Sequence, residues 1–559
     1  MKVAYPKFNK VQIWYFHIIK ENNYLHIKYI MKIKQNGLIV FLSILIAVFA
    51  VSCADEWDEH YNATAPDKLD MNLYEYLKTQ ENLSVFTSML ELTGYDSIIN
   101  ESQTFTVWAP DNEALKDYVP SLLMIAVDPE FGEEFAGPGM YTLSDIRKLV
   151  GNHITRFSQT SAGLKLRKVL MLNGKLVDFS KTGNGLLFGE KPVTKSDIAV
   201  SNGIVHVLSA YTPYRKNLWE FINETEGLES LREYINSLTR EEFDPEASIV
   251  DGVLMDSIMR ETNDLLELVA ELNNEDSVYT AILPDNNAWT EAYDRIFPYF
   301  KTTVADGGEE IQIKRTQWAL VRNLFFRGKI GIPVTADTLY STLGLPYAAP
   351  ARLFENAQPN IMSNGLSYVS PQLKYTANEA WFDPIRIEAE YNFYGRTTSN
   401  YEASTLSGLG TGANISARNY ALFTDISQSS LSNLSVTFPI PNTLSGKYNI
   451  YCVFVPAKLV DSTDVRPYKV KFSLKYTDSA GKIVNFGAVT STNEVKLNGS
   501  KGTFITNPEI VDKMLVVKDF EFPFSNIIDF TEQNFINKIS VALKVENATA
   551  KTPAEMVKF

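Results

Sequence analysis

The chain has 559 residues, of which 45% are hydrophobic and 21% charged, and these proportions exclude a disordered or fibrous protein. The formal net charge is −14, and it becomes −20 without residues 1–52, which contain seven lysines and one glutamate. A chain this acidic repels phosphate backbones, so we expect no binding to nucleic acid. The length allows three or four domains, each with an ordinary core.

An uncharged apolar run occupies residues 37–51 and is preceded by Lys32 and Lys34. Its 15 residues are too few to cross a bilayer comfortably but suit the apolar core of a signal peptide. Because Met31 stands directly before the two lysines, we expect translation to begin there. Residues 1–52 are then an incorrectly assigned leader followed by a signal peptide.

The apolar run ends in Ala50-Val51-Ser52-Cys53, which resembles a bacterial lipobox. In that motif a signal peptidase cuts before the cysteine, and the sulfur carries a diacylglycerol. Ala50 departs from the leucine that is usual there. The resemblance implies lipidation of Cys53 and attachment to the outer membrane. The alternatives are an ordinary cleaved signal peptide with an incidental cysteine, or a retained N-terminal anchor.

Residues 53–70 form an acidic tether with Asp55, Glu56, Asp58 and Glu59 near its start. An acidic run directly behind the lipid-bearing cysteine resembles the signal that sends lipoproteins of glycan-harvesting bacteria to the outer face of the outer membrane. The resemblance implies a lipid-anchored protein exposed at the cell surface. A solvated, flexible linker explains the same charges and is compatible with it.

One phrase occurs twice, as TFTVWAPDNEAL at 104–115 and VYTAILPDNNAW at 278–289. Three further blocks recur in the same order. They are NLYEYLKTQENL (72–83) with NLWEFINETEGL (217–228), LVGNHI (149–154) with LVRNLF (320–325), and SNGIVHVLS (201–209) with SNGLSYVSP (363–371). Four matched blocks in one order indicate a duplicated domain. We place the copies at 71–215 and 216–376.

Each copy has the pattern of a mixed α and β unit. Apolar residues recur at helical spacing after residue 72, and Gly94 is suited to end that helix. FTVWA has the composition of a buried strand, and Pro110 ends it because proline cannot donate to a strand ladder. We expect Asp111 or Asn112 to cap a helix that starts near Glu113.

The other residues that we expect to define the fold, which we call the frame residues, follow from the same comparison. Pro284, Asp285 and Asn286 occupy the corresponding places in the second copy. Asn202 and Gly203 form a turn that leads into the strand NGIVHVLS.

The order of a helix, a strand ending in FTVWAPDNEAL, a helix carrying LVGNHI and a closing SNGIVHVLS resembles the fasciclin (FAS1) domain. That family's signature blocks look like T-hydrophobic-FAP-T/D-N-x-A-F and N-G-x-I-H-x-hydrophobic-D. The second copy matches less well, because Leu324 and Tyr368 stand where the first has His153 and His206. The resemblance implies two tandem α+β fasciclin-like domains with an extracellular adhesion or interaction role and no catalytic apparatus.

The residues themselves agree that catalysis is not expected. Beyond residue 52 the histidines are His60, His153 and His206, and none has a second histidine or a cysteine at metal-ligand spacing. We expect His153 and His206 to be core or turn histidines bonded to backbone. No nucleophile elbow or phosphate-binding loop occurs, so we expect no catalytic residue, no metal and no cofactor.

Residues 384–559 contain short alternating runs separated by turn residues. In YKVKFSLKY (468–476), Val470, Phe472 and Leu474 share one face, and KISVALKV (538–545) alternates in the same way. We expect an antiparallel β-sandwich of jelly-roll type that opens with the strand RIEAEYN (386–392). These strands loosely resemble those of carbohydrate-binding modules.

If this region binds sugar, aromatic residues on loops are the candidates, because a flat ring can stack on a pyranose. The candidates are Trp381, Tyr391, Tyr394 and Tyr401, which lie near polar residues. The alternative is that they are core or sheet-surface aromatics.

Three functions fit these patterns. The first is a non-catalytic surface lipoprotein that captures a glycan or other nutrient alongside a SusC/SusD-type transporter. The second is a cell-adhesion protein that binds host matrix or other cells through its fasciclin-like domains. The third is a glycoside hydrolase with paired carboxylates in the sandwich, which we do not favour, because carboxylate pairs are easily found in an acidic chain.

Overall fold

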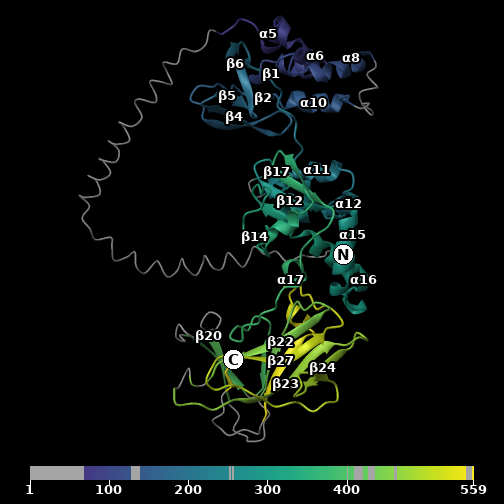
Figure 1. The fold of residues 1–559 in the computed structure, drawn as a ribbon, viewed down its shortest axis with the longest axis vertical. Helices are drawn as coiled ribbons and strands as arrows, with labels where there is room; N and C mark the ends of the chain where they lie inside the picture. Colours follow the sequence, from purple (N-terminus) through teal and green to yellow (C-terminus); the bar gives the residue numbers. More distant parts are fainter. Residues whose placement is uncertain are drawn as a thin grey trace, which may run out of the picture.

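The computed structural model describes residues 68–127, 139–250, 253–254, 257–399, 401–407, 419–425, 435–456, 458, 462–548 and 557–558. The expected signal peptide, Cys53 and the tether up to residue 67 lie outside these residues. Figure 1 shows three bodies in a row, which we call the first unit (71–215), the second unit (216–376) and the C-terminal domain (from 384). Each has a hydrophobic core of its own. No helix in the described part of the chain is long and apolar enough to cross a bilayer.

Helices cover one side of the first unit. They are α5 (Leu73–Thr79), η1 (Glu81–Leu83), α6 (Ser84–Thr93), α7 (Tyr95–Ile99), η2 (Lys116–Tyr118), α8 (Val119–Val127) and α10 (Leu143–Gly151). A capping box begins α5, in which Asn72 and Glu75 each accept a bond from the other's backbone N–H at 2.9 Å. Gly94 ends α6 with φ +77°, as the sequence predicts.

The first unit has one seven-stranded sheet, in the order β2-β1-β7-β6-β5-β4-β3. Its strands are β1 (Phe105–Pro110), β2 (Ile154–Arg156), β3 (Leu166–Leu170), β4 (Leu176–Thr182), β5 (Gly185–Phe188), β6 (Lys191–Val200) and β7 (Gly203–Leu208). Strand β1 pairs parallel with β7 and antiparallel with β2. It is buried along its whole length, with Val107 in the core beneath the helices and Trp108 in a second core beneath β4 and β5.

The helix expected near Glu113 begins later in the first unit. Asp111 Oδ1 accepts a bond from Ala114 N at 2.9 Å, but residues 112–115 form a turn and α8 begins only at Val119. A helix running on from Glu113 would need an N–H at Pro120, which proline lacks. In the second unit the prediction is correct, because Asp285 caps α15 (Asn286–Ile296) by accepting from Ala288 N at 2.8 Å.

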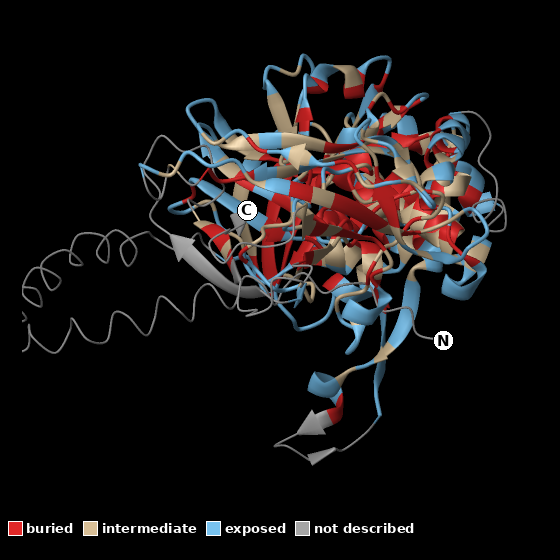
Figure 2. Cartoon of the chain, turned by 90° about the horizontal axis from the view of Figure 1, so that it is seen from below, coloured by how far each residue is buried: buried red, intermediate tan, exposed pale blue. Residues whose placement is uncertain are grey.

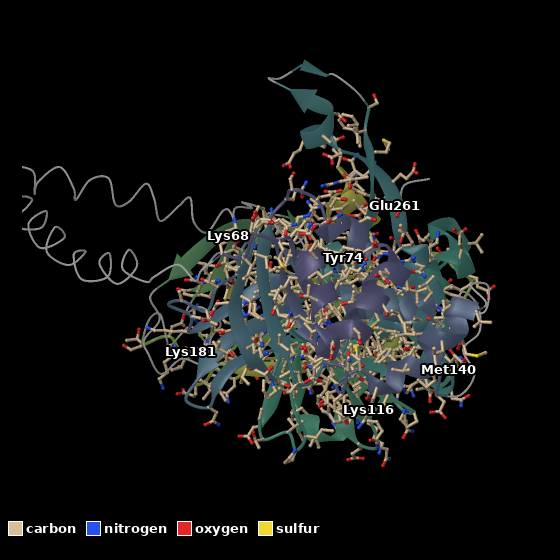
Figure 3. The ribbon with its side chains drawn as sticks, turned by 90° about the horizontal axis from the view of Figure 1, so that it is seen from above. Lys68, Tyr74, Lys116, Met140, Lys181 and Glu261 are labelled. Carbon is tan, nitrogen blue, oxygen red and sulfur yellow. The ribbon has the colours of Figure 1, made fainter. Side chains whose placement is uncertain are left out.

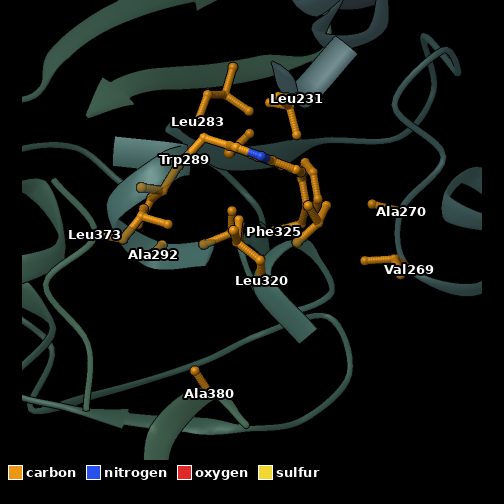
Figure 4. Packing of buried hydrophobic residues seen from close by; sticks show 14 of the residues in the cluster. Leu231, Val269, Ala270, Leu283, Trp289, Ala292, Leu320, Phe325, Leu373 and Ala380 are labelled. Carbon is orange, nitrogen blue, oxygen red and sulfur yellow. The ribbon is translucent and has the colours of Figure 1, made fainter. Parts of the chain in front are cut away.

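The second unit repeats the centre of the first. Strand β12 (Tyr279–Pro284) pairs parallel with β17 (Gly365–Ser370) and antiparallel with β13 (Phe325–Arg327), and the sheet order β13-β12-β17-β16 corresponds to β2-β1-β7-β6. The other elements are α11 (Leu218–Glu224), α12 (Glu229–Ser237), α14 (Asp264–Leu268), η3 (Phe297–Phe300), η4 (Val304–Asp306), α16 (Gly308–Val321), β14 (Thr338–Tyr340), β15 (Pro346–Ala348), η5 (Pro350–Phe354) and β16 (Gln358–Met362). Trp289 and Phe325 lie in its core (Figure 4).

An arm projects from the second unit between α12 and α14 (Figure 2). It consists of β8 (Thr239–Phe243), α13 (Pro245–Ser248), β9 (Ile249–Val250), β10 (Val253–Leu254) and β11 (Met259–Asn263). Strands β8 and β11 pair with each other, and most of their described side chains are exposed. Figure 3 shows this arm, which carries Glu261, rising from the body.

A buried cation joins the first two units. Lys175 is 4% exposed, and its Nζ lies 2.7 Å from both Glu220 Oε2 and Glu275 Oε1 of the second unit. Burial opposes ionisation of Glu220, but bonds from Lys175, the Asn217 backbone and Tyr214 outweigh it and hold the pKa of Glu220 below its ordinary value.

The second unit and the C-terminal domain are also in contact. After α17 (Ala377–Ala380), Phe382 packs edge-on against Tyr299 with ring centroids 5.3 Å apart. Backbone N–H groups of the C-terminal domain donate to the second unit, from Ser445 to Tyr299 O and from Ser525 to Lys301 O, each at 2.8 Å.

The C-terminal domain is built from strands. They are β18 (Thr397–Ser399), β19 (Tyr401–Ser407), β20 (Asn419–Asp425), β21 (Ser435–Pro439), β22 (Lys447–Phe454), β23 (Lys469–Thr477), β24 (Ile483–Val489), β25 (Val495–Lys496), β26 (Phe504–Ile505), β27 (Asp512–Glu521), β28 (Ala542–Asn547) and β29 (Val557–Lys558), with a single turn of helix η8 (Phe535–Lys538). The largest sheet has the order β18-β21-β28-β23-β24-β25. The prediction for β23 is confirmed, because Val470, Phe472 and Leu474 are fully buried.

Two strand predictions in this domain need correction. RIEAEYN is not a strand, because the Ala389 carbonyl accepts from the Arg396 guanidinium rather than from a neighbouring strand. KISVALKV becomes a strand only from Ala542, because the Asn526 side chain takes the backbone bonds of Lys538 O and Ser540 N.

Candidate functional site

The Pro-Asp-Asn phrase holds helices in place in both units. The structure places Asp111 and Asp285 directly after Pro110 and Pro284, where each accepts one backbone bond. Asn112 Oδ1 accepts from Val85 N, and Asn286 Oδ1 accepts from Ser230 N, each at 3.0 Å. Because every one of these bonds goes to the protein's own backbone, the repeated phrase is a structural joint.

The Asn-Gly turn is a second joint of the same kind. Asn202 Oδ1 accepts from Leu73 N, and its Nδ2 donates to Ile99 O, each at 2.8 Å. Asn364 does the same in the second unit, accepting from Leu218 N at 2.9 Å and donating to Leu272 O at 2.8 Å. At Gly203 an added Cβ would lie 2.1 Å from Phe105 O, so no side chain fits there.

His153 is fully buried and has backbone partners on both ring nitrogens. Its Nδ1 lies 2.8 Å from Leu149 O, and its Nε2 accepts from Thr212 N at 3.0 Å. These partners assign the proton to Nδ1. Burial lowers the pKa of His153 to about 4, against the smaller effect of the Leu149 carbonyl. A ring held neutral between backbone groups is structural.

His206 has a similar environment in the second core. Its ring stacks on Trp108 with centroids 5.4 Å apart, its Nε2 lies 2.8 Å from Gln159 O, and its Nδ1 accepts from Asp197 N at 3.3 Å. Burial lowers its pKa, although the Gln159 carbonyl and the Asp197 carboxylate act in the opposite direction. Both histidines therefore belong to the frame. Among the described residues no group of three or more His, Cys, Asp or Glu is placed to hold a metal ion.

One of the four predicted ligand-binding aromatics is buried, and the side chain of another is not described. Trp381 is 4% exposed and packs in the core of the second unit, where Tyr375 and Tyr299 contact its ring, so the prediction of a surface role for it is wrong. It is buried because it follows α17, which packs against that core. The side chain of Tyr401 lies outside the described residues.

Of the remaining two predicted residues, Tyr394 contacts a group of aromatic rings on the C-terminal domain. Tyr394 contacts Phe393, with ring centroids 5.1 Å apart, and Phe530, at 5.9 Å. Phe535 lies 5.6 Å from Phe393 and 5.3 Å from Phe530. Tyr391 lies two residues before Phe393 in the same loop. We call these five residues the aromatic cluster.

Two members of the aromatic cluster are open to solvent, whereas Tyr394, Phe530 and Phe535 are partly buried. Phe393 is 60% exposed and Tyr391 is 57% exposed, which is unusual for two large aromatic side chains so close in sequence. Close approach of the two loops builds the cluster, because Gly395 has φ +77° and a Cβ there would lie 2.5 Å from Ile536 Cγ2. A solvent-exposed group of flat rings can stack on sugar rings or other apolar ligand faces.

Sequence reasoning missed Phe393, Phe530 and Phe535. Phe530 and Phe535 stand in the polar stretch DFTEQNF, and aromatic residues in a polar loop were the available signal. Arg396, a polar residue next to these aromatics in sequence, turns toward the domain, where its guanidinium lies 5.1 Å from the centre of the Phe423 ring.

A comparison with protein families finds a match within the first unit. Residues 81–211 match the model of the Fasciclin domain. This part of the chain is a fasciclin domain. Its boundaries enclose β1, both frame histidines and the Asn202-Gly203 turn. Fasciclin domains are generally non-catalytic adhesion domains, and no enzyme family is indicated.

A solved structure of a FAS1 domain pair, from the insect cell adhesion molecule fasciclin I, is also similar to the chain. The match has 11% sequence identity and covers 55% of this chain and 97% of that chain, with a TM-score of 0.18. The fasciclin domain thus rests on the match at 81–211, together with the strand order and the frame residues described above.

Proposed function

We propose that the chain is a non-catalytic, surface-exposed lipoprotein that binds a glycan or another nutrient and acts as an accessory to a SusC/SusD-type outer-membrane transporter. The observation that carries this proposal is the aromatic cluster, in which Phe393 and Tyr391 remain more than half exposed. Flat rings that keep this exposure suit the apolar faces of pyranose units. The fasciclin domain supports a binding role over a catalytic one.

Affinity gel electrophoresis of the full chain against a panel of soluble polysaccharides tests this proposal. We expect at least one polysaccharide to retard the protein, and we expect F393A/F535A to abolish the retardation. Tyr451, 46% exposed on β22 of the same domain, provides the control Y451A, which should bind as the parent does. No retardation by any polysaccharide, together with no co-purification of a transporter, contradicts the proposal.

The lipid anchor forms part of the proposal. Support comes from the apolar run at 37–51, from Cys53 behind it and from the acidic residues that follow. Mass spectrometry of the membrane fraction should find a diacylglyceryl group on Cys53, and C53S should release the protein from the membrane. Protease added to whole cells should digest the parent protein if it faces outward.

We also propose that the second unit is a diverged fasciclin-like domain and that the C-terminal domain is a β-sandwich of jelly-roll type. The first idea is supported by the common strand order and by the matching bonds of Asn202 and Asn364. The second is supported by a core that takes Phe472 from the largest sheet and Val517 from the β22–β27 pair.

The alternative function is cell adhesion through the fasciclin domain, which the match at 81–211 favours. A strain that lacks the gene separates the two functions. Loss of attachment to matrix or to other cells, with normal growth on glycans, favours adhesion. Impaired growth on a glycan, with normal attachment, favours nutrient capture.

A further inference from the structure

The segment from residue 146 to 177 differs from the rest of this acidic chain. It contains seven Lys and Arg residues and no Asp or Glu. Four of these side chains are exposed on or beside β2 and β3, namely Arg156, Lys165, Arg167 and Lys168. None of the four forms an ion pair with another residue that the structure describes. Their charges therefore face solvent.

Hydrogen bonds bring β2 and β3 together, although these strands stand at opposite ends of the sheet order. Leu172 N donates to Ile154 O at 2.8 Å, and Thr155 Oγ1 donates to Leu170 O at 2.5 Å. Arg167 Nη1 donates to Gln159 Oε1 at 2.9 Å. These bonds show that residues 154–159 run antiparallel to residues 167–172. In this alignment Phe157 lies opposite residues 168–169.

Phe157 is an unusual residue for its backbone position. It has φ +71°, in the left-handed region that costs a residue with a side chain about 1–2 kcal/mol. Its O accepts from Thr106 Oγ1 at 2.8 Å, as Gly328 O accepts from Thr280 Oγ1 at 2.7 Å in the second unit. The second unit thus has glycine, with φ +81°, at the position where the first has phenylalanine.

The ring of Phe157 does not offset this cost by packing, because the side chain is 73% exposed. Leu166 and Leu170, on the outer face of β3, are 64% and 61% exposed. An exposed aromatic ring held in a strained conformation, beside cations without ion-pair partners, is typical of a binding surface.

We propose that Arg156, Phe157, Lys165, Leu166, Arg167 and Lys168, which we call the basic edge, bind an acidic polysaccharide. Arg156 and Arg167 would pair with its carboxylates or sulfates, and the Phe157 ring would stack on a sugar face. This inference rests on the proposed function in taking the ligand to be a glycan. The inference adds that the glycan is negatively charged. It also adds a second binding site, which is distant in sequence from the aromatic cluster.

Charge distribution favours a single polysaccharide chain over a membrane surface. An anionic membrane extends beyond the basic edge and would also face the acidic remainder of a chain with net charge −14. A polysaccharide chain is narrow enough to lie along the edge, and at physiological salt the more distant acidic groups are screened beyond about 8 Å. Asp178 on β4 is the register partner of Lys168, so the ligand's anionic groups would pair with Arg156 and Arg167 rather than with Lys168.

The test uses the full chain in detergent, with polygalacturonate as the acidic probe and pullulan as the neutral one. Affinity electrophoresis and calorimetry should show binding to polygalacturonate that weakens as salt is added. F157G should weaken this binding by about tenfold without loss of stability, because glycine relieves the left-handed strain. R156Q/R167Q/K168Q should abolish it. The matched control R327Q/K329Q/K482Q removes three exposed cations elsewhere and should bind as the parent does.

The outcomes separate this inference from the proposed function. If pullulan or another neutral glycan is bound but polygalacturonate is not, the role proposed for the basic edge is wrong and the proposed function stands. If no polysaccharide of either charge is bound, the role proposed for the basic edge is wrong, and the proposed function is wrong as well when no transporter co-purifies. Binding of polygalacturonate that F157G and the triple variant leave unchanged overturns the basic edge. So does tighter binding to phosphatidylglycerol vesicles than to polygalacturonate.

Discussion

Tyr368 of the second unit replaces His206 of the first and makes the corresponding hydrogen bond. The Tyr368 hydroxyl donates to Ile330 O at 2.7 Å, and His206 Nε2 lies 2.8 Å from Gln159 O. Ile330 and Gln159 correspond, because each donates its N–H to a threonine of the central strand, Thr280 or Thr106. The corresponding loop of each unit is thus hydrogen-bonded to the corresponding strands, by a histidine in the first unit and by a tyrosine in the second.

We expect Tyr368→Phe to destabilise the second unit by about 1 kcal/mol, because Ile330 O loses its donor while the ring stays in place. Hydrogen–deuterium exchange of β17 peptides should become faster. Tyr340, 63% exposed on β14, provides the control Y340F, which should leave exchange unchanged. Equal exchange in Y368F and the parent contradicts the assigned bond.

The first unit should lose stability as pH falls from 6.5 to about 4. His153 has a folded pKa of about 4, against an ordinary value of 6.5, so the unfolded chain binds more protons in this range. The loss from this residue is on the order of 3 kcal/mol at the acidic end. Exchange of β7 peptides measured across this range should report it.

The second unit serves as an internal control for this pH effect. It contains no histidine and has Leu324 where the first unit has His153. H153L should reduce the pH dependence of the first unit, and the part that remains comes from His206, whose pKa burial also lowers. The variant should lose some stability because Thr212 N–H loses its acceptor. Equal acid sensitivity of both units would falsify the histidine explanation.

Lys175→Met should loosen the contact between the first two units by about 3 kcal/mol, because it leaves the Glu220 and Glu275 carboxylates without their shared cation. Small-angle scattering should show a larger radius of gyration, whereas K181M, at an exposed site, should scatter as the parent does. Because the folded pKa of Glu220 is lowered, its contribution is present above the ordinary value of 4.5 and is lost as pH falls through the folded pKa.

Gly203→Ala should destabilise the first unit by about 3 kcal/mol or more, because the new methyl group would meet Phe105 O at 2.1 Å and the backbone cannot yield cheaply. Gly183, where nothing lies within 4 Å of an added Cβ, provides the control G183A. Thermal unfolding should move to lower temperature in G203A only. A parent-like transition in G203A would mean that β1 and β7 lie further apart than described.

The sequence predicted the features that depend on local chemistry. The two Pro-Asp-Asn joints, the Asn-Gly turns and the alternation of β23 follow from proline's missing donor, short capping side chains and the two-residue strand period. The helix start at Glu113 failed because Pro120, seven residues further on, decides where that helix can begin.

The aromatic cluster could only be half predicted. Tyr391 and Tyr394 stand near polar residues, and that signal was visible, but Phe530 and Phe535 come more than 130 residues later and reach them through the tertiary fold. The contact of Lys175 with Glu275 could not be predicted for the same reason, because it depends on how the first two units pack against each other. The prediction for Trp381 was wrong for a related reason. Helix α17, which precedes Trp381, packs on the core of the second unit, and the residues next to this helix in sequence do not indicate that packing.

The arm of the second unit has a practical use. Because β8 and β11 pair with each other and not with the sheet of the second unit, the core around Trp289 is complete without the arm. An epitope tag or a fluorescent reporter can therefore be inserted between these strands. A tag at that place leaves both termini and the core of the second unit unaltered.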